Sequence, residues 1–119
     1  MAYDHDLADR IRELVASEDG VTERQMFGGL SFLTNGNMSV AASGQGGLLV
    51  RVSPDGADDL VDGEHVRTMV MRNREMRGWL NVDDTAVASD AQLEAWVTRG
   101  VTYARSLPAK TAKGTARRG

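Results

Sequence analysis

Four arginines lie close together between residues 67 and 77, and a tryptophan follows them. The residues are Arg67, Arg72, Arg74, Arg77 and Trp79, with Glu75 as the one acid after Arg72. Guanidinium groups in such a patch can bind anions, nucleic acid or an acidic protein, and a neighbouring indole ring can add a cation–π contact. The alternative is that the arginine stems cover apolar surface at a sheet edge while their charged groups stay in water. The sequence leaves both interpretations open.

An acidic segment precedes this patch and ends at a histidine. Its carboxylates are Asp58, Asp59, Asp62 and Glu64, and the histidine is His65. Clustered carboxylates can hold a hard cation, but on a helix they more often form a solvated face. We therefore expect no bound metal here.

No set of residues has the composition of a catalytic site. The chain contains no cysteine, which excludes disulfides, thiolate zinc sites and cysteine nucleophiles. His5 and His65 are isolated, and neither has a His or Glu four residues later that would complete a metal pair on a helix. No nucleophile stands out with a base and an orienting group. We expect a protein that is not an enzyme and carries no cofactor.

Two glycine-rich segments, Gly28-Gly29 and Gly44-Gln-Gly-Gly47, invite comparison with phosphate-binding loops. Neither has the spacing of such a loop, and each leads into strand-like sequence rather than into a helix N-terminus, whose free N–H groups hold phosphate. Gly28-Gly29 follows the short apolar segment Met26-Phe27, which indicates a bulge or a close approach of two backbones. We interpret both segments as structural, with glycine allowing a bulge, a turn or a close approach of two backbones.

The elements that position these residues follow from the spacing of apolar side chains. Residues 4–19 and 89–107 have the periodicity of amphipathic helices, and Pro108 ends the second one. Asn35-Gly36 between two strand-like runs predicts a hairpin, and Ser53-Pro54 predicts the start of a short helix. Strands are expected over residues 30–33, 37–43, 48–52, 66–71 and 78–82, with residues 72–77 as a polar connection.

These elements predict an α+β fold with two layers. An antiparallel sheet of about five strands, rich in meander connections, is packed by the N-terminal helix and the long C-terminal helix. Residues 1–108 are expected to form a single domain. Residues 109–119 have basic charge and glycine but no bulky apolar side chain, which predicts a disordered tail.

Charge is distributed unevenly along the chain. The formal charge is −3, to which residues 110–119 contribute +4, so the rest of the chain carries −7. An acidic body argues against a domain that binds nucleic acid over its whole surface. No apolar run approaches the roughly 20 residues of a membrane-spanning helix, and the N-terminus lacks the layout of a signal peptide. We expect a cytoplasmic protein without membrane contact.

Several motifs together resemble the N-terminal domain of TfoX, the bacterial competence regulator. The most specific motif contains Met26, Phe27, Gly28 and Gly29; the Asn35-Gly36 hairpin and the segments 48–52, 75–80 and 93–107 match in order and spacing. The resemblance covers residues 4–108 and is to the small stand-alone members. It implies a two-layer α+β domain, a link to transcriptional control of DNA uptake, and no established catalytic residue.

Three functions agree with these observations. The first is a non-catalytic regulatory or interaction module, which we expect to form a homodimer through a sheet edge or open sheet face and to bind a protein partner. The second is nucleic-acid binding through Arg72, Arg74, Arg77 and the basic tail. The third is a small-ligand binder or an unrecognised enzyme, with a pocket near Phe27, Gly28, Gly29 and Trp79.

Overall fold

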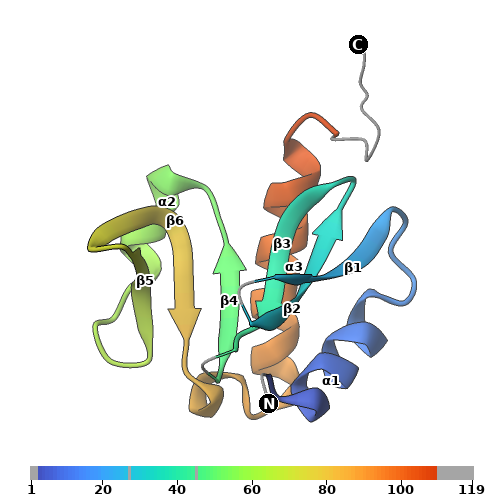
Figure 1. The fold of residues 1–119 in the computed structure, drawn as a ribbon, viewed down its shortest axis with the longest axis horizontal. Coiled ribbons are helices and arrows are strands. Elements are labelled where there is room, and N and C mark those ends of the chain that lie inside the picture. Colours follow the sequence, from blue (N-terminus) through green and yellow to red (C-terminus); the bar gives the residue numbers. More distant parts are fainter. Residues whose placement is uncertain (1–2, 27, 45, 110–119) are drawn as a thin grey trace.

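The structure is a computed structural model that describes residues 3–26, 28–44 and 46–109. Its elements are α1 (His5–Val15), β1 (Val21–Met26), β2 (Gly29–Thr34), β3 (Asn37–Ala42), β4 (Leu48–Arg51), α2 (Pro54–Leu60), β5 (Val66–Met71), β6 (Arg74–Val82), the 3-10 helix η1 (Asp84–Val87) and α3 (Asp90–Ser106). All strand pairs are antiparallel, in the order β1-β2-β3-β4-β6-β5. Helices α1 and α3 lie on one face of this sheet (Figure 1). The predicted two-layer α+β fold is confirmed, with six strands rather than about five.

Two strands differ from the prediction. The short apolar segment at Met26 belongs to a six-residue strand, β1, whose polar sequence gave little strand signal. Strand β6 begins at Arg74 rather than Gly78, so residues 72–77 are not a connection. Arg72 and Asn73 alone make the turn, with φ of 55° and 66°. Two residues in the left-handed conformation are typical of a tight hairpin turn. Neither of them is glycine, so the sequence did not indicate this turn.

The two long helices begin where their caps predict. Asp4 caps α1, because its Oδ1 accepts hydrogen bonds from the backbone N–H groups of Asp6 and Leu7. Ser89 and Gln92 form a capping box at the start of α3. Helix α1 ends at Val15, four residues earlier than expected, and Gly20 lies in the turn that follows.

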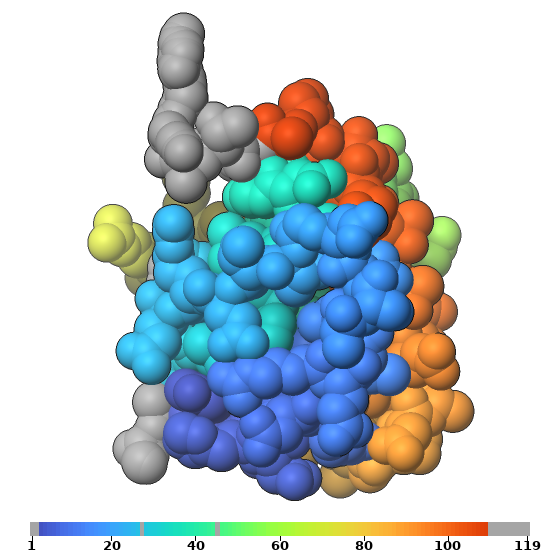
Figure 2. All heavy atoms as spheres, turned by 90° about the vertical axis from the view of Figure 1, so that its right-hand side faces the viewer, coloured from blue at the N-terminus to red at the C-terminus, as the bar shows by residue number. Residues whose placement is uncertain are grey.

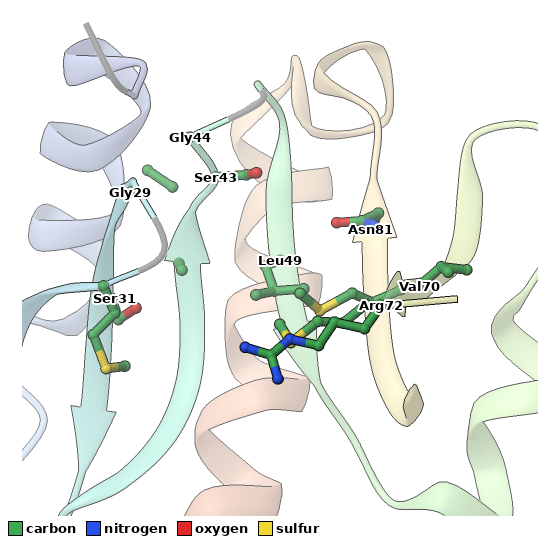
Figure 3. A pocket seen from close by; sticks show the side chains of 13 residues that line it. Gly29, Ser31, Ser43, Gly44, Leu49, Val70, Arg72 and Asn81 are labelled. Carbon is green, nitrogen blue, oxygen red and sulfur yellow. The ribbon is translucent and has the colours of Figure 1, made fainter. Parts of the chain in front are cut away.

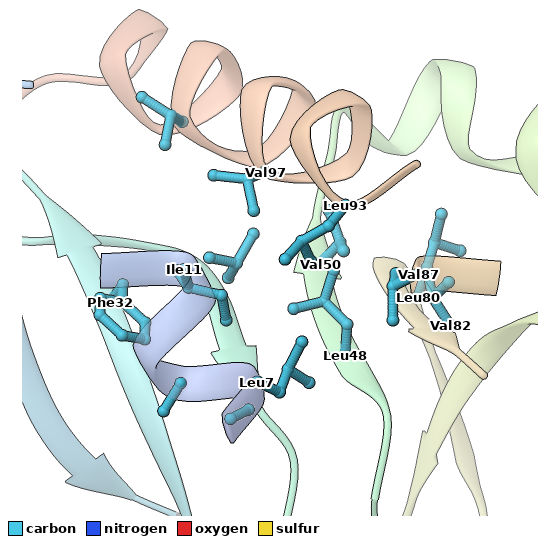
Figure 4. Packing of buried hydrophobic residues seen from close by; sticks show 14 of the residues in the cluster. Leu7, Ile11, Phe32, Leu48, Val50, Leu80, Val82, Val87, Leu93 and Val97 are labelled. Carbon is cyan, nitrogen blue, oxygen red and sulfur yellow. The ribbon is translucent and has the colours of Figure 1, made fainter. Parts of the chain in front are cut away.

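The main core lies between the sheet and these helices. Phe32, Val40, Val50 and Leu80 are paired in register across β2, β3, β4 and β6, and all are fully buried. Figure 4 shows Ile11 of α1, and Leu93 and Val97 of α3, packed over this layer. One face of β2, β3, β4 and β6 therefore packs in the core, and the alternate residues of these strands point to the other face. No helix among the described residues is long and apolar enough to span a membrane.

The two edges of the sheet differ in character. At the β1 edge the residues between Val21 and Met26 are exposed and polar or charged. Arg12 of α1 holds this strand by a paired contact with Glu23, at 2.7 Å and 3.0 Å. Figure 2 shows α1 and β1 together forming this end of the molecule, with α3 beside α1. The opposite edge, β5, has the sequence Val-Arg-Thr-Met-Val-Met and exposes Val70.

The last part of the predicted tail cannot be compared with the structure. Residues 110–119 lie outside the described residues, as do Phe27 and Gln45. The single-domain boundary at residue 108 and the tail therefore stay predictions.

Candidate binding site on the open face of the sheet

One row of paired residues crosses all six strands on the face that the helices leave open. From β1 to β5 the row contains Arg24, Ser31, Ala41, Leu49, Asn81 and Arg67. Residues paired directly across antiparallel strands point to the same face, so this row alternates with the core row that contains Phe32 and Val50. The open face is thus polar at both ends and small or apolar in the middle.

A second apolar cluster lies on this open face. Its buried members are Met38, Ala41 and Leu49, and the partly buried Met26, Met69 and Trp79 pack against them. A hollow of about 300 Å³ lies beside this cluster. It is lined by Met26, Gly29, Ser31, Ala41, Ala42, Ser43, Gly44, Leu49, Met69, Val70, Met71, Arg72 and Asn81. A volume of this size is at the lower end of the range for small-molecule sites.

Small residues are the reason that the face is hollowed. The floor of the hollow contains Ala41 and two glycines, Gly29 and Gly44. A side chain on Gly44 would come within 2.6 Å of the Gly28 carbonyl oxygen, and one on Gly29 would clash with the Ala42 carbonyl oxygen. The backbones of the Gly28-Gly29 corner and of residues 42–44 therefore touch directly, with no side chain between them.

A buried hydroxyl lacks a partner at the edge of this hollow. The Ser31 side chain is fully buried, and its Oγ has no hydrogen-bond partner among the described residues. Leaving a buried polar group unsatisfied costs about 1–3 kcal/mol, so such groups are uncommon in folded proteins. Thr34 Oγ1 is also buried without a hydrogen-bond partner among the described residues. Thr34 lies at the far end of β2, however, and does not line the hollow.

Two longer polar side chains complete the lining. Figure 3 shows the Asn81 amide and the Arg72 guanidinium directed toward the space over Leu49, with Ser31 on the opposite side. Arg72 makes no ion pair with any described residue. Among the described residues that line the hollow, it is the one charged side chain, and none of them is an acid. The hollow therefore combines one cation, neutral hydrogen-bonding groups and apolar walls.

The predicted arginine patch is divided by the structure. Arg67 pairs with Asp83 at 3.2 Å, and Arg77 donates to the Pro54 carbonyl oxygen at 3.1 Å. Arg72 and Arg74 lie at the other end of the β5–β6 hairpin from Arg67, and neither pairs with a described acid. The arginines thus do not form one continuous cationic surface, and nucleic-acid binding stays a prediction that rests on Arg72, Arg74 and the tail.

Trp79 has a cationic neighbour from outside the predicted patch. The Arg51 guanidinium carbon lies 5.1 Å from the centroid of the Trp79 ring and 5.6 Å from that of Tyr103. Arg51 and Trp79 are paired across β4 and β6. This contact joins the open-face cluster to helix α3, which is a structural role for Trp79.

The acidic segment near His65 forms a turn. Among the described residues, no group of three His, Cys, Asp or Glu side chains could hold a metal ion. Instead, Asp62 Oδ1 accepts three backbone hydrogen bonds of 2.8 Å, from the N–H groups of Glu64, His65 and Val66. These bonds, the one from Val66 most of all, hold the pKa of Asp62 below its usual range, because they stabilise the charged carboxylate.

Asp62→Asn is expected to reduce the loss of stability that the protein undergoes as the pH is lowered into the acid range. Because the pKa of Asp62 is lower in the folded than in the unfolded chain, its stabilisation is complete above the unfolded value of about 4. It is lost as the pH falls through the folded value. The difference in melting temperature between wild type and Asp62→Asn should therefore be largest at neutral pH and shrink below about pH 4. Thermal unfolding followed by circular dichroism measures this difference.

Asp59→Asn is the matched control, since Asp59 is exposed on α2 and loses the same charge. A difference for Asp62→Asn that stays constant from neutral to acid pH would contradict the role of the turn.

The other predicted residues lie around the hollow or away from it. Met26 and Gly29 line it, and Gly28 has a φ of 77° at the corner between β1 and β2. The Asn35-Gly36 hairpin is confirmed, with φ of 53° and 84°, at the opposite end of β2. Sequence reasoning did not identify Ser31 or Asn81. The signal was present in Leu30-Ser31-Phe32, where a polar residue alternates with apolar ones and so points away from the core.

Comparison with known proteins gives the family of the chain. No curated protein and no solved structure matches it. A family model, the TfoX N-terminal domain, matches residues 13–104, which include every strand of the sheet and most of α3. The predicted resemblance is therefore confirmed, and the chain belongs to the TfoX N-terminal domain family.

Proposed function

We propose that this protein is a non-catalytic interaction module of the bacterial cytoplasm that acts as a homodimer in transcriptional regulation. The regulatory part of the proposal is supported by the family, whose name comes from a competence regulator. The dimeric part is supported by one observation, the exposed apolar residue Val70 on the edge strand β5.

The second half of strand β5 has fewer of the devices that normally keep a sheet edge from pairing: its exposed charge, Arg67, and its register shift between Thr68 and Met69 both come before Val70. Natural edges are blunted by charges, prolines or a covering segment. The β1 edge follows this rule, since Glu23 and Arg24 are exposed on it. The β5 edge instead exposes Val70, a residue that is 59% accessible. Among the described residues it is the one large hydrophobic residue that is exposed to this degree.

A second copy of the chain can pair with this edge. The backbone groups on the outer side of β5 have no strand neighbour in the six-stranded sheet. Two β5 strands related by a two-fold axis would pair antiparallel and join the two sheets into one. Asp62 and Gly63 already donate to the Val66 carbonyl oxygen, so the pairing surface begins after Val66 and is centred nearer Val70.

Val70→Lys is expected to convert the dimer into a monomer. A lysine at this position places a charge at the centre of the proposed pairing surface, which is how natural edges prevent association. Size-exclusion chromatography with light scattering at micromolar concentration should give the dimer mass for wild type and the monomer mass for the variant. Thr22→Lys, on the exposed β1 edge, is the matched control and should remain dimeric.

A clean monomer for the wild-type protein at micromolar concentration would contradict the dimer. A Val70→Lys protein that stays dimeric would show that another surface forms the interface. Because Val70 is exposed, Val70→Lys should not unfold the protein. A cooperative thermal unfolding transition, followed by circular dichroism, checks that the variant is folded.

A further inference from the structure

We propose that the open face of the sheet is a docking groove for an acidic amphipathic helix of a partner protein. The helix would place its apolar stripe between the methionines of this face and its carboxylates beside the arginines at the two sides. The inference rests on the interaction-module part of the proposed function, for which it names the partner, and it does not depend on the homodimer.

The methionines of the described chain are segregated on the open face. The main core between the sheet and the helices contains none among its described residues. The second apolar cluster contains three, and the other two are on the same face, since one lines the hollow and one is paired with Met69. The five are Met26, Met38, Met69, Met71 and Met76. Flexible methionines are typical of adaptable binding surfaces, whereas rigid cores favour Leu, Ile and Val.

The open face is hollowed between its two edges. Met26 belongs to β1, and Met69 and Met71 belong to β5, the two edge strands of the sheet, yet all three line the hollow of about 300 Å³. Ala41 and Leu49 of the central strands lie between them (Figure 3). This volume holds roughly ten non-hydrogen atoms at about 30 Å³ each, which is two or three leucine side chains. The apolar stripe of a helix therefore fits it, as in other complexes in which a helix binds in an apolar groove.

The strand residues of the open face carry only positive charge, although the chain as a whole is acidic. The structure describes all six strands, and these contain two acids, Glu23 and Glu75. Glu23 is paired with the core residue Phe32, and Glu75 alternates with the open-face residue Met76, so both acids point to the other face. The arginines that point to the open face are Arg24, Arg51, Arg67 and Arg74.

Three arginines beside the hollow are left without an acidic partner. Arg24 lies on β1 at one side, and Arg72 and Arg74 lie at the β5–β6 turn on the other side. None of the three forms an ion pair with a described acid. A helix with glutamates on both flanks of its apolar stripe would pair with them. Exposed pairs of this kind add little affinity, but they select a partner of opposite charge.

The apolar character of the face favours a helix over a nucleic acid. Sheets that bind single strands stack the bases on aromatic side chains. Among the strand residues of this face, Trp79 is the one aromatic residue, and the Arg51 guanidinium already lies over its ring at 5.1 Å. Methionine and leucine side chains instead contact the aliphatic side chains of a helix.

Titration of the full-length protein with a designed helical peptide tests the proposal. The probe has about eighteen residues, which is about 27 Å of helix, with a leucine stripe flanked by glutamates. The control peptide has lysine in place of each glutamate. We expect the methyl NMR signals of Met26, Met69 and Met71 to shift and saturate with the glutamate peptide, with a Kd on the order of 100 μM or lower. The lysine peptide should bind at least about tenfold more weakly.

Two results of this titration would overturn the proposal. The first is equal binding of the two peptides. The second is the lack of saturable shifts at the three methionines, including the case in which the glutamate peptide shifts only signals of the basic residues 110–119.

Substitutions then assign the binding to the groove. Arg72→Glu and Met71→Gln should each weaken binding of the glutamate peptide by about fivefold to tenfold, through charge repulsion and loss of apolar contact respectively. Arg99→Glu is the matched charge control, because Arg99 is exposed on α3, on the other face of the sheet. It should change the Kd by less than about twofold. An equal effect of Arg72→Glu and Arg99→Glu would show attraction by overall charge and overturn the assignment.

Two further measurements separate this inference from the alternatives. A single-stranded DNA of about twelve nucleotides should leave the three methionine signals unchanged at physiological salt. If the DNA shifts them and the glutamate peptide does not, the face binds nucleic acid and the proposal is wrong. Light scattering reads the oligomeric state independently. A monomer that binds the peptide would remove the dimer and keep the groove, and a dimer that binds no peptide would do the reverse.

Discussion

Replacing Gly29 with valine is expected to lower the free energy of unfolding by about 3 kcal/mol or more, and the melting temperature by roughly 10 °C or more. A Cβ at this position would clash with the Ala42 carbonyl oxygen and lie 2.9 Å from the Gly44 nitrogen. Both are backbone atoms of a neighbouring strand and its turn, so they cannot rotate away as the end of a side chain can. Relief requires β2 and β3 to separate, which disturbs the core row at Phe32 and Val40. Thermal unfolding by circular dichroism measures the effect.

Two other glycines provide controls for this prediction. Gly56→Ala lies in α2 with no atom near its Cβ, and should stabilise the protein by up to about 1 kcal/mol. A side chain at Gly28 would have no close neighbour, and only the φ of 77° would be strained. Gly28→Val should therefore lower the free energy of unfolding by about 1–2 kcal/mol, which is less than the effect of Gly29→Val. A Gly29→Val protein with the wild-type melting temperature but without partner or ligand binding would show that the glycine pair acts in recognition instead.

The fold could be predicted largely because its signals are local. The helix caps at Asp4 and Ser89 and the Asn35-Gly36 turn each depend on residues within four positions of one another. The missing pieces were those with weak local signals. Strand β1 is polar because it is an edge, and the Arg72-Asn73 turn takes two left-handed conformations without glycine. Residues other than glycine adopt left-handed conformations in a turn when the pairing of the flanking strands outweighs their local conformational preference.

The candidate site could be predicted less well because it depends on register between strands. Ser31, Leu49 and Asn81 are far apart in the chain, and only the pairings of β2, β3, β4 and β6 bring them onto one row of the same sheet face. The sequence did group the arginines as one patch, but it could not show that Asp83 is paired with Arg67. Arg72 is distinguished from the other arginines by contacts that form only in the folded sheet.

Gly100 in the middle of α3 has a role that helix periodicity did not reveal. A Cβ at Gly100 would come within 2.5 Å of the Ser39 carbonyl oxygen and 2.7 Å of Val40 Cγ1. The helix therefore rests directly on the backbone of β3 at this point. Asn37 fixes the far end of the same contact, because its Nδ2 donates to the carbonyl oxygens of Ala104 and Pro108 at 3.4 Å and 3.0 Å. Held in this way, α3 cannot shift outward without breaking these bonds.

Gly100→Leu is therefore expected to destabilise the protein by about 3 kcal/mol, although leucine forms helices better than glycine by nearly 1 kcal/mol. Thr98→Leu, at an exposed position of the same helix, introduces the same side chain and should leave the melting temperature within a few degrees of wild type. Thermal unfolding of the two variants separates packing from helix propensity. If Gly100→Leu were as stable as Thr98→Leu, the close approach of α3 to β3 would not be a requirement of the fold.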